Sequence, residues 1–166
     1  MKFLKYSFLL GAMTILILLP ATFAANKAED PYEKIEKITQ ELIVIISLHQ
    51  KDYPKNERQY FDAISDLLIN TVDFNYIAKK VVGQYRTDIT KQQRLLFAEK
   101  FRQGLIETYG RGLINYGNQQ IVLINRSPLK KGQKTLIVQQ EIISSGNKFP
   151  LRYSMARKKT GEWMVI

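Results

Sequence analysis

A run with helical spacing, from Val72 to Tyr116, constrains the fold of this chain more than any other stretch. Within it, large apolar residues recur at every fourth position, which places them along one side of a single long α-helix. Thr90 and Gln93 have the spacing of a capping box, so we expect this helix to begin at Thr90. A helix with large apolar side chains along one side needs a large apolar surface to pack against. The row consists of Phe97, Phe101, Leu105, Tyr109 and Leu113.

A shorter helix is expected just before the long one. Asp73 is a suitable cap at its start, and Gly83 is a suitable stop, because glycine adopts the left-handed conformation at low cost. A polar connector, residues 86–89, then leads to Thr90. The apolar residues of the short helix follow the i, i+3, i+4, i+7 pattern and are Phe74, Ile77, Ala78 and Val81.

Two further helices are expected upstream. Asp30 followed by Pro31 is a typical helix start, and the apolar spacing that follows runs to about residues 48–50. A loop containing Pro54 separates this helix from the next, which spans about 57–70. Four helical segments therefore fill the first two-thirds of the chain.

Strand patterns replace helical ones after Tyr116. Apolar, β-branched or alternating runs occupy about 121–124, 135–144, 151–156 and 162–166, and short turn sequences separate them. Strands joined by short turns predict an antiparallel meander. Helices followed by strands predict an α+β fold in which the helices pack on a curved four-stranded sheet. At 166 residues, the chain is expected to form a single domain.

The first residues have the pattern of a secretory signal peptide. Lys2 and Lys5 precede an apolar run at 8–19, and small residues follow up to Ala24. The run is shorter than the roughly 20 residues of a membrane-spanning helix. We therefore expect a signal peptide at 1–24, a single domain at 25–166, and a periplasmic location. The alternative is an uncleaved anchor in the inner membrane.

Few residues suggest catalysis, and we expect the protein not to be an enzyme. The chain has no cysteine and one histidine, His49, which falls at a predicted helix end, where a cation is favoured. Asp62 and Asp66 are one helical turn apart, but Arg58 is close in sequence, so a solvated pair is the simpler interpretation. The sequence 110–112, Gly-Arg-Gly, lacks the features of a phosphate loop. We expect no metal and no cofactor.

The basic residues are unevenly placed. Nine cations and a single acidic residue, Glu141, lie between Arg126 and Lys159. They suit a solvated sheet edge, where lysines discourage strand pairing, or a surface for anionic headgroups or acidic partners. Nucleic acid is not an expected partner of a secreted protein. The candidate patch for a headgroup or partner consists of Lys148, Arg152, Arg157, Lys158 and Lys159.

An ordered set of short motifs resembles the MlaC, or toluene-tolerance, family of periplasmic phospholipid carriers. The motifs are Asp73-Phe74, Val82-Gly83-Gln84-Tyr85, Gln93-Arg94 with Phe97 and Phe101, and Thr108-Tyr109. The resemblance covers roughly residues 31–166. The sequence 161–163 resembles the Gly-x-Trp strand of the family, which continues with further strand and a C-terminal helix. By this resemblance the chain looks like a member truncated at its C-terminus, with part of the family domain missing.

The resemblance implies that phospholipid is the cargo and that its acyl chains occupy an apolar pocket between helices and sheet. It also implies two membrane partners, an outer-membrane lipoprotein complex and the substrate-binding subunit of an inner-membrane ABC transporter. The role would be to move lipid between the two membranes and so maintain outer-membrane lipid asymmetry. The alternatives are a periplasmic enzyme or small-ligand binder with a cone-shaped pocket, and a membrane-anchored adaptor without a ligand.

Strand alternation selects the residues expected to line such a pocket. Leu151, Tyr153 and Met155 share one face of the third strand, and Val138 and Ile142 are expected beside them if Gln140 has the same parity. The helices would complete the lining with Phe74, Ile77, Val81, Phe101, Leu105, Tyr109 and Leu113.

Overall fold

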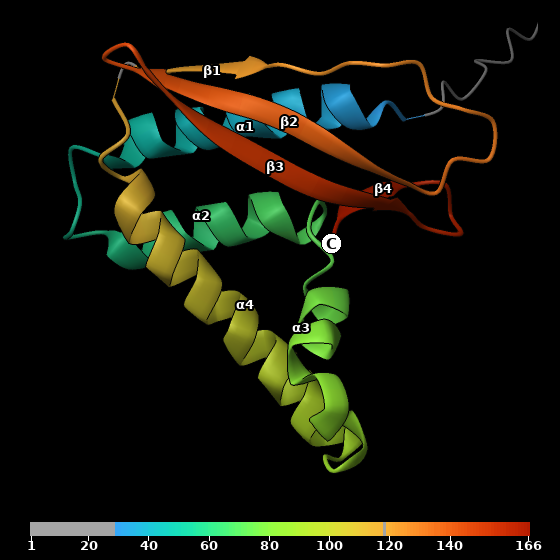
Figure 1. Ribbon diagram of the computed structural model, residues 1–166. Helices are drawn as coiled ribbons and strands as arrows, with labels where there is room; N and C mark the ends of the chain where they lie inside the picture. Colours follow the sequence, from blue (N-terminus) through green and yellow to red (C-terminus); the bar gives the residue numbers. More distant parts are fainter. Residues whose placement is uncertain (1–28, 118) are drawn as a thin grey trace, which may run out of the picture.

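The computed structural model describes residues 29–117 and 119–166, so the expected signal peptide at 1–24 lies outside the described residues. Four α-helices come first, a short 3-10 helix (η1) joins the third to the fourth, and a four-stranded antiparallel sheet follows (Figure 1). The strands are adjacent in chain order, as a meander requires. The predicted α+β class is confirmed. The helices are α1 (Pro31–His49), α2 (Glu57–Ile69), α3 (Phe74–Val82), η1 (Gly83–Thr87) and α4 (Lys91–Leu113), and the strands are β1 (Gln120–Leu123), β2 (Thr135–Ser144), β3 (Asn147–Arg157) and β4 (Trp163–Val165).

α1 and α4 begin where local capping chemistry predicts. The Asp30 carboxylate accepts a hydrogen bond from the Tyr32 amide at 2.8 Å, with Pro31 in the first turn of α1. At the start of α4, the Thr90 hydroxyl accepts from the Gln93 amide at 3.2 Å, and the Gln93 side chain accepts from the Thr90 amide at 2.8 Å. These bonds satisfy amide groups that have no partner inside the helix.

The connection from α3 to α4 differs in part from the expectation. Gly83 ends α3 with a φ of +55°, as expected of a glycine stop. The chain then continues directly into η1 instead of an extended polar connector, and the Asp88 amide donates to the Tyr85 carbonyl at 3.1 Å. A 3-10 turn provides backbone partners that an extended connector would lack. The two helices therefore form a closed hairpin.

The β2–β3 hairpin fixes the register of the sheet. Ser145 and Gly146 both have positive φ values, 48° and 80°, as a two-residue turn of this twist requires, so β3 begins at Asn147, earlier than predicted. Val138 is paired with Tyr153 and Gln140 with Leu151. Directly paired residues point to the same face of a sheet, so the predicted apolar face is continuous across both strands.

The outer edge of β4 is paired with the link between α2 and α3. The Asp73 amide donates to the Val165 carbonyl at 2.9 Å, and the Val165 amide donates to the Thr71 carbonyl at 2.8 Å. Val72 and Val165 form a parallel bridge. This pairing was not predicted from the sequence, and it attaches the start of α3 to the sheet.

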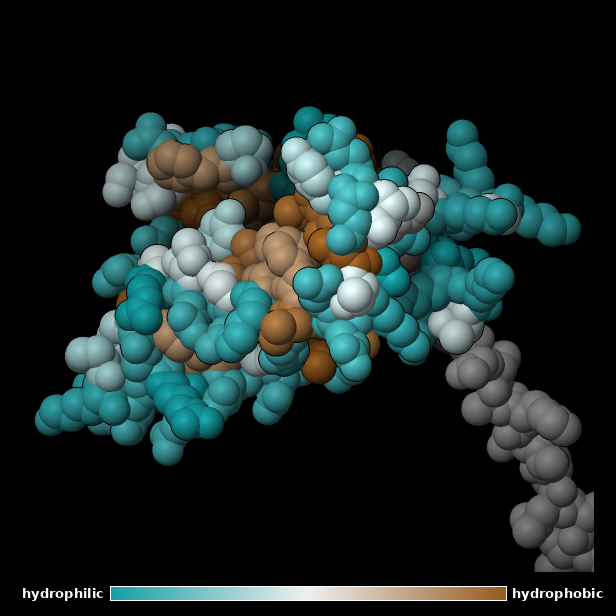
Figure 2. Space-filling view, turned by 90° about the horizontal axis from the view of Figure 1, so that it is seen from below, coloured by the Kyte–Doolittle hydropathy of each residue, from teal (hydrophilic) through white to brown (hydrophobic). Residues whose placement is uncertain are grey.

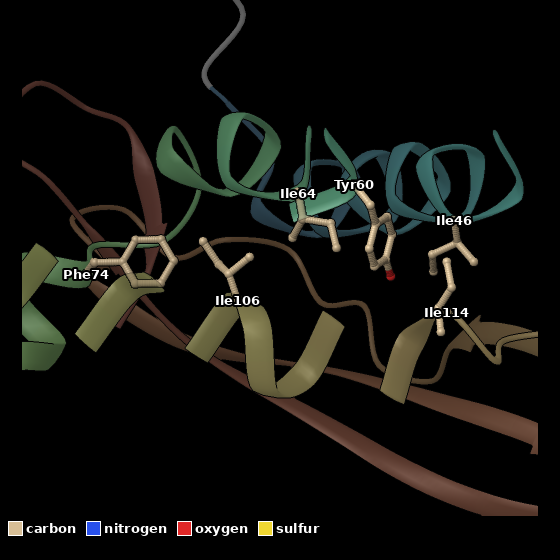
Figure 3. Close-up of a cluster of buried hydrophobic side chains, with 6 residues drawn as sticks. All are labelled: Ile46, Tyr60, Ile64, Phe74, Ile106 and Ile114. Carbon is tan, nitrogen blue, oxygen red and sulfur yellow. The ribbon is translucent and has the colours of Figure 1, made fainter. Parts of the chain in front are cut away.

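The buried residues form two clusters. One lies among the helices and contains Ile46, Tyr60, Ile64, Phe74, Ile106 and Ile114 (Figure 3). The other lies against the sheet and contains Tyr32, Ile35, Val138, Met155 and Trp163. α1 contributes to both, because its first turns cross the sheet and Ile46 near its end reaches the helical cluster.

α4 packs on α2 and α3, and it runs from the far end of the α3–α4 hairpin toward the sheet (Figure 1). The close approach to α2 occurs at Gly110, whose carbonyl accepts a hydrogen bond from the Tyr60 hydroxyl at 3.0 Å. A side chain at this position would meet the Phe61 ring. Gly110 therefore leaves room for a neighbouring aromatic ring. Within the described residues, no helix is long and apolar enough to cross a membrane.

Candidate functional site

The inner face of the sheet carries the apolar residues selected by alternation. The register confirms that Leu151, Tyr153 and Met155 share this face with Val138 and Ile142. Val138 and Met155 are fully buried against the first turns of α1, whereas Leu151, Tyr153 and Ile142 are half-buried. The face is thus tightly packed where α1 crosses it and less covered toward the β2–β3 turn.

A small polar group interrupts this face. Gln140 is 2% exposed, and its side-chain oxygen accepts a hydrogen bond from the Thr39 hydroxyl at 3.1 Å. Burial raises the pKa of the Tyr153 hydroxyl, and a hydrogen bond with Thr39 partly opposes that shift. Gln140 lies on the same face as Val138 and Ile142, as expected, and α1 covers it. The three side chains remain uncharged at neutral pH, so they can orient a polar group without bringing a charge into the apolar layer. Thr39 was missed because nothing local in the sequence marks a helix residue that faces a sheet.

The row on α4 is only partly covered. Phe97 and Phe101 stack with ring centroids 5.8 Å apart, and Leu105 and Leu113 pack at the border of the helical cluster. Tyr109 is 66% exposed. A helix of a folded protein normally hides its broadest apolar side. In α4, the described residues leave part of the apolar side exposed at Tyr109.

The three candidates on α3 have different surroundings. Phe74 is buried in the helical cluster, Ile77 is half-buried, and Val81 is exposed. Of the selected residues, Phe74, Leu105 and Leu113 belong to the helical cluster, whereas Val138, Tyr153 and Met155 belong to the cluster against the sheet. Their common role as a pocket lining stays a prediction.

Two apolar pockets flank the α3–α4 hairpin. They have volumes of about 480 Å³ and about 460 Å³, and both are bordered by Val82 and Phe97. The second extends to Tyr85 and Ile89, in and just after η1. Val82, Tyr85 and Ile89 were not among the residues predicted to line a pocket. Their apolar side chains close to the predicted helix stop at Gly83 could have indicated them. Figure 2 shows hydrophobic surface in the middle of the face that contains the hairpin, with hydrophilic surface around it.

The basic residues of the sheet half are partly neutralised. Lys148 pairs with Glu141 at 3.3 Å, and Lys158 pairs with Asp73, the cap residue of α3, at 3.1 Å. The Arg157 side chain donates to the Gly161 carbonyl at 3.0 Å. Arg152 and Lys159 are exposed and form no salt bridge with the residues that the structure describes. Three residues of the predicted patch, Lys148, Arg157 and Lys158, therefore form contacts within the protein.

The other titratable candidates have structural surroundings. His49 lies in the last turn of α1, with its ring 5.8 Å from that of Tyr60. Asp62 pairs with Arg58 at 3.8 Å in an exposed position, as the sequence suggested. Burial raises the pKa of Tyr60 to about 12, so this hydroxyl serves as a neutral donor to Gly110. Across residues 29–117 and 119–166, no group of acidic and histidine side chains is arranged to hold a metal ion.

These features describe an α+β protein in which helices and a curved sheet leave part of their apolar surface uncovered. The family model for the MlaC protein matches residues 36–166, and the chain belongs to this family.

Two curated relatives and one solved structure resemble the chain. Toluene tolerance protein ttg2D of Pseudomonas putida is 26% identical over 156 residues, which are 93% of this chain and 71% of the relative. The intermembrane phospholipid transport system binding protein MlaC of Haemophilus influenzae is 27% identical over 148 residues, which are 87% of this chain and 68% of the relative. A phospholipid-binding protein from Ralstonia solanacearum, solved in complex with a phospholipid, superposes with a TM-score of 0.73. It is 18% identical and matches 82% of this chain and 75% of its own, which supports the shared fold.

Proposed function

We propose that this protein is a periplasmic carrier that holds a phospholipid by its acyl chains. The observation that carries the proposal is the uncovered apolar row of α4, at which Tyr109 is 66% exposed although the helix is otherwise packed on α2 and α3. The name of the Haemophilus influenzae relative and the lipid in the solved relative agree with this ligand. The proposed lining consists of Phe74, Ile77, Val81, Phe101, Leu105, Tyr109, Leu113, Val138, Ile142, Leu151, Tyr153 and Met155.

The physical demand on a carrier explains this choice of residues. Each methylene removed from water contributes about 0.8 kcal/mol, so two acyl chains of roughly thirty methylenes together would cost more than about 20 kcal/mol to expose. The headgroup can stay in water, because burying an unpaired charge is unfavourable. A carrier therefore needs apolar surface with few polar anchors, and it needs no catalytic group.

The proposal also includes the cellular location of the protein, its transport role and its partners. The leader at 1–24 would export the chain to the periplasm, where lipid would move between outer and inner membranes to maintain outer-membrane asymmetry. Docking would involve an outer-membrane lipoprotein complex and the substrate-binding subunit of an ABC transporter. On the basic patch, Arg152 and Lys159 are the best candidates for partner contact, since Lys148 and Lys158 already pair within the chain.

Mass spectrometry of the protein purified from the periplasm tests the carrier function. We expect a native mass that corresponds to a chain beginning at Ala25 with bound phospholipid, and organic extraction should release that lipid. A protein that retains Met1 in the membrane fraction would contradict the proposed export. A periplasmic protein without lipid would contradict the carrier function.

One substitution distinguishes a lipid site from a filled core. Leu151→Trp places a ring on the half-buried inner face, and we expect it to displace lipid while the melting temperature of the delipidated protein changes little. If the space were already filled, overpacking would cost about 1–3 kcal/mol. Ser154→Trp is the matched control, because Ser154 is exposed on the opposite face of the same strand. Lipid retained by Leu151→Trp, or lost equally from both variants, would exclude this face from the site.

A further inference from the structure

The end of the α3–α4 hairpin, residues 76–96, exposes an unusual amount of apolar surface. Val81, Tyr85, Leu95 and Leu96 are between 57% and 62% exposed, and Tyr76 is exposed as well. The η1 turn of this hairpin lies far from the sheet (Figure 1), whereas Leu95 borders a pocket that Lys158 and Met164 of the sheet half also line. Single exposed apolar residues are ordinary, but a group of large ones marks an interaction surface.

Three cations lie in the same stretch of the chain as these apolar residues. Lys79, Lys80 and Lys91 are exposed, and none forms a salt bridge with a described residue. The Lys80 ammonium lies 5.5 Å from the centre of the Tyr76 ring. Asp88 is the one acidic residue in this stretch of sequence, and its carboxylate accepts a hydrogen bond from the neighbouring Thr87 hydroxyl. The three lysines of the hairpin end therefore keep their positive charge exposed.

We propose that the hairpin end docks on the surface of an anionic phospholipid bilayer. Tyr85 and Leu96 would enter the headgroup layer, and the three lysines would lie at the level of the lipid phosphates. Interfacial binding of this kind combines buried apolar area with attraction of lysines to anionic lipids.

Charge argues against a second copy of the chain as the occupant. In a symmetric dimer, the same surface patch of each subunit faces its own copy. Two hairpin ends in contact would bring Lys79, Lys80 and Lys91 against the lysines of the other copy, and facing like charges are unfavourable. A surface of phosphate groups neutralises all three lysines at once. The proposal does not depend on the carrier function, because a protein can dock on a bilayer whether or not it holds a lipid.

Co-sedimentation with vesicles tests the docking. The probe is phosphatidylcholine vesicles with or without phosphatidylglycerol, and we expect binding to the anionic vesicles that weakens as salt is added. The double variant Lys79→Glu, Lys80→Glu should bind at least about tenfold more weakly, since each lysine near the surface contributes on the order of 1 kcal/mol. The matched control is Lys130→Glu, Lys131→Glu, an exposed and unpaired lysine pair in the β1–β2 loop, which should retain binding. An equal loss in both double variants would overturn the proposal.

A fluorescent reporter tests insertion separately, including the case in which the charge variant fails to fold. Trp163 is the single tryptophan and is 1% exposed, so it gives a constant background. Leu96→Trp should shift its emission to shorter wavelength with anionic vesicles, and Leu129→Trp in the β1–β2 loop should not. Absence of the shift would overturn insertion, and a dimeric mass in light scattering would assign the surface to a second copy. The lipid extraction described above reports on the carrier function independently.

Discussion

Asp30 links the start of the helical layer to the loop that follows β1. Partial burial alone would raise the pKa of its carboxyl group, but hydrogen bonds from the Tyr32 amide, the Arg126 guanidinium and the Glu33 amide hold that pKa below its ordinary value of 3.8. Arg126 lies 2.8 Å from Asp30 and also approaches Glu33 at 3.1 Å and Glu36 at 3.7 Å. A depressed pKa means that the charged form stabilises the fold above the pKa of the unfolded chain. That contribution is lost as the pH falls through the pKa of the folded state.

The variant Asp30→Asn isolates this charge, because asparagine also caps helices well. We expect it to lower the free energy of unfolding at pH 7 by about 1 kcal/mol. The difference from the parent protein should begin to shrink near pH 3.8, the ordinary pKa of Asp30, and should shrink further as the pH falls through the lowered pKa of the folded protein. Urea unfolding of both proteins at pH 7 and pH 3 measures the difference in the free energy of unfolding. Glu33 and Glu36 are present in both proteins, so their own protonation contributes to both measurements. A difference that is independent of pH would show that the charge of Asp30 is unimportant.

At the scale of one element, α4 contains glycines in contrasting surroundings. An added Cβ at Gly104 would meet no atom within 4 Å, whereas at Gly110 it would lie 2.9 Å from Cε1 of Phe61. Gly104→Ala should therefore raise the free energy of unfolding by about 0.5–1 kcal/mol through helix propensity. Gly110→Ala should lower it by roughly 1–3 kcal/mol, because the Phe61 ring must move. Thermal and urea unfolding of the two variants measure both effects, and equal stabilisation would mean that α2 and α4 do not cross closely at Gly110.

The whole molecule consists of two apolar clusters that share α1 and are further joined where residues 71–73 pair with β4. A lipid held along the partly covered apolar row of α4 would bury the apolar surface that the protein leaves exposed there. Ligand that binds the folded state alone stabilises it, by about 2.7 kcal/mol at a concentration one hundred times Kd. We expect the melting temperature of the lipid-loaded protein to exceed that of the stripped protein by several degrees, with recovery on reloading. Calorimetry measures the change, and identical melting temperatures would count against a site for lipid in the folded protein.

The sequence by itself determined the local structure. The caps at Asp30, Asp73 and Thr90 and the stop at Gly83 are visible in it, because each acts within a few residues through hydrogen bonds or backbone preference. Alternation in β3 likewise fixed which side chains share a face, since successive side chains of a strand point to opposite sides.

Only the tertiary structure decided which faces meet. The spacing of the α4 row identified an apolar side, but it could not show that α4 packs on α2 and α3 and leaves Tyr109 exposed. The pairing of Lys158 with Asp73, and of β4 with residues 71–73, joins segments about ninety residues apart in sequence. Contacts of this kind depend on how the whole chain closes, and no pattern within a few residues records them. The same reason explains why the exposed end of the α3–α4 hairpin became recognisable as a surface only in three dimensions.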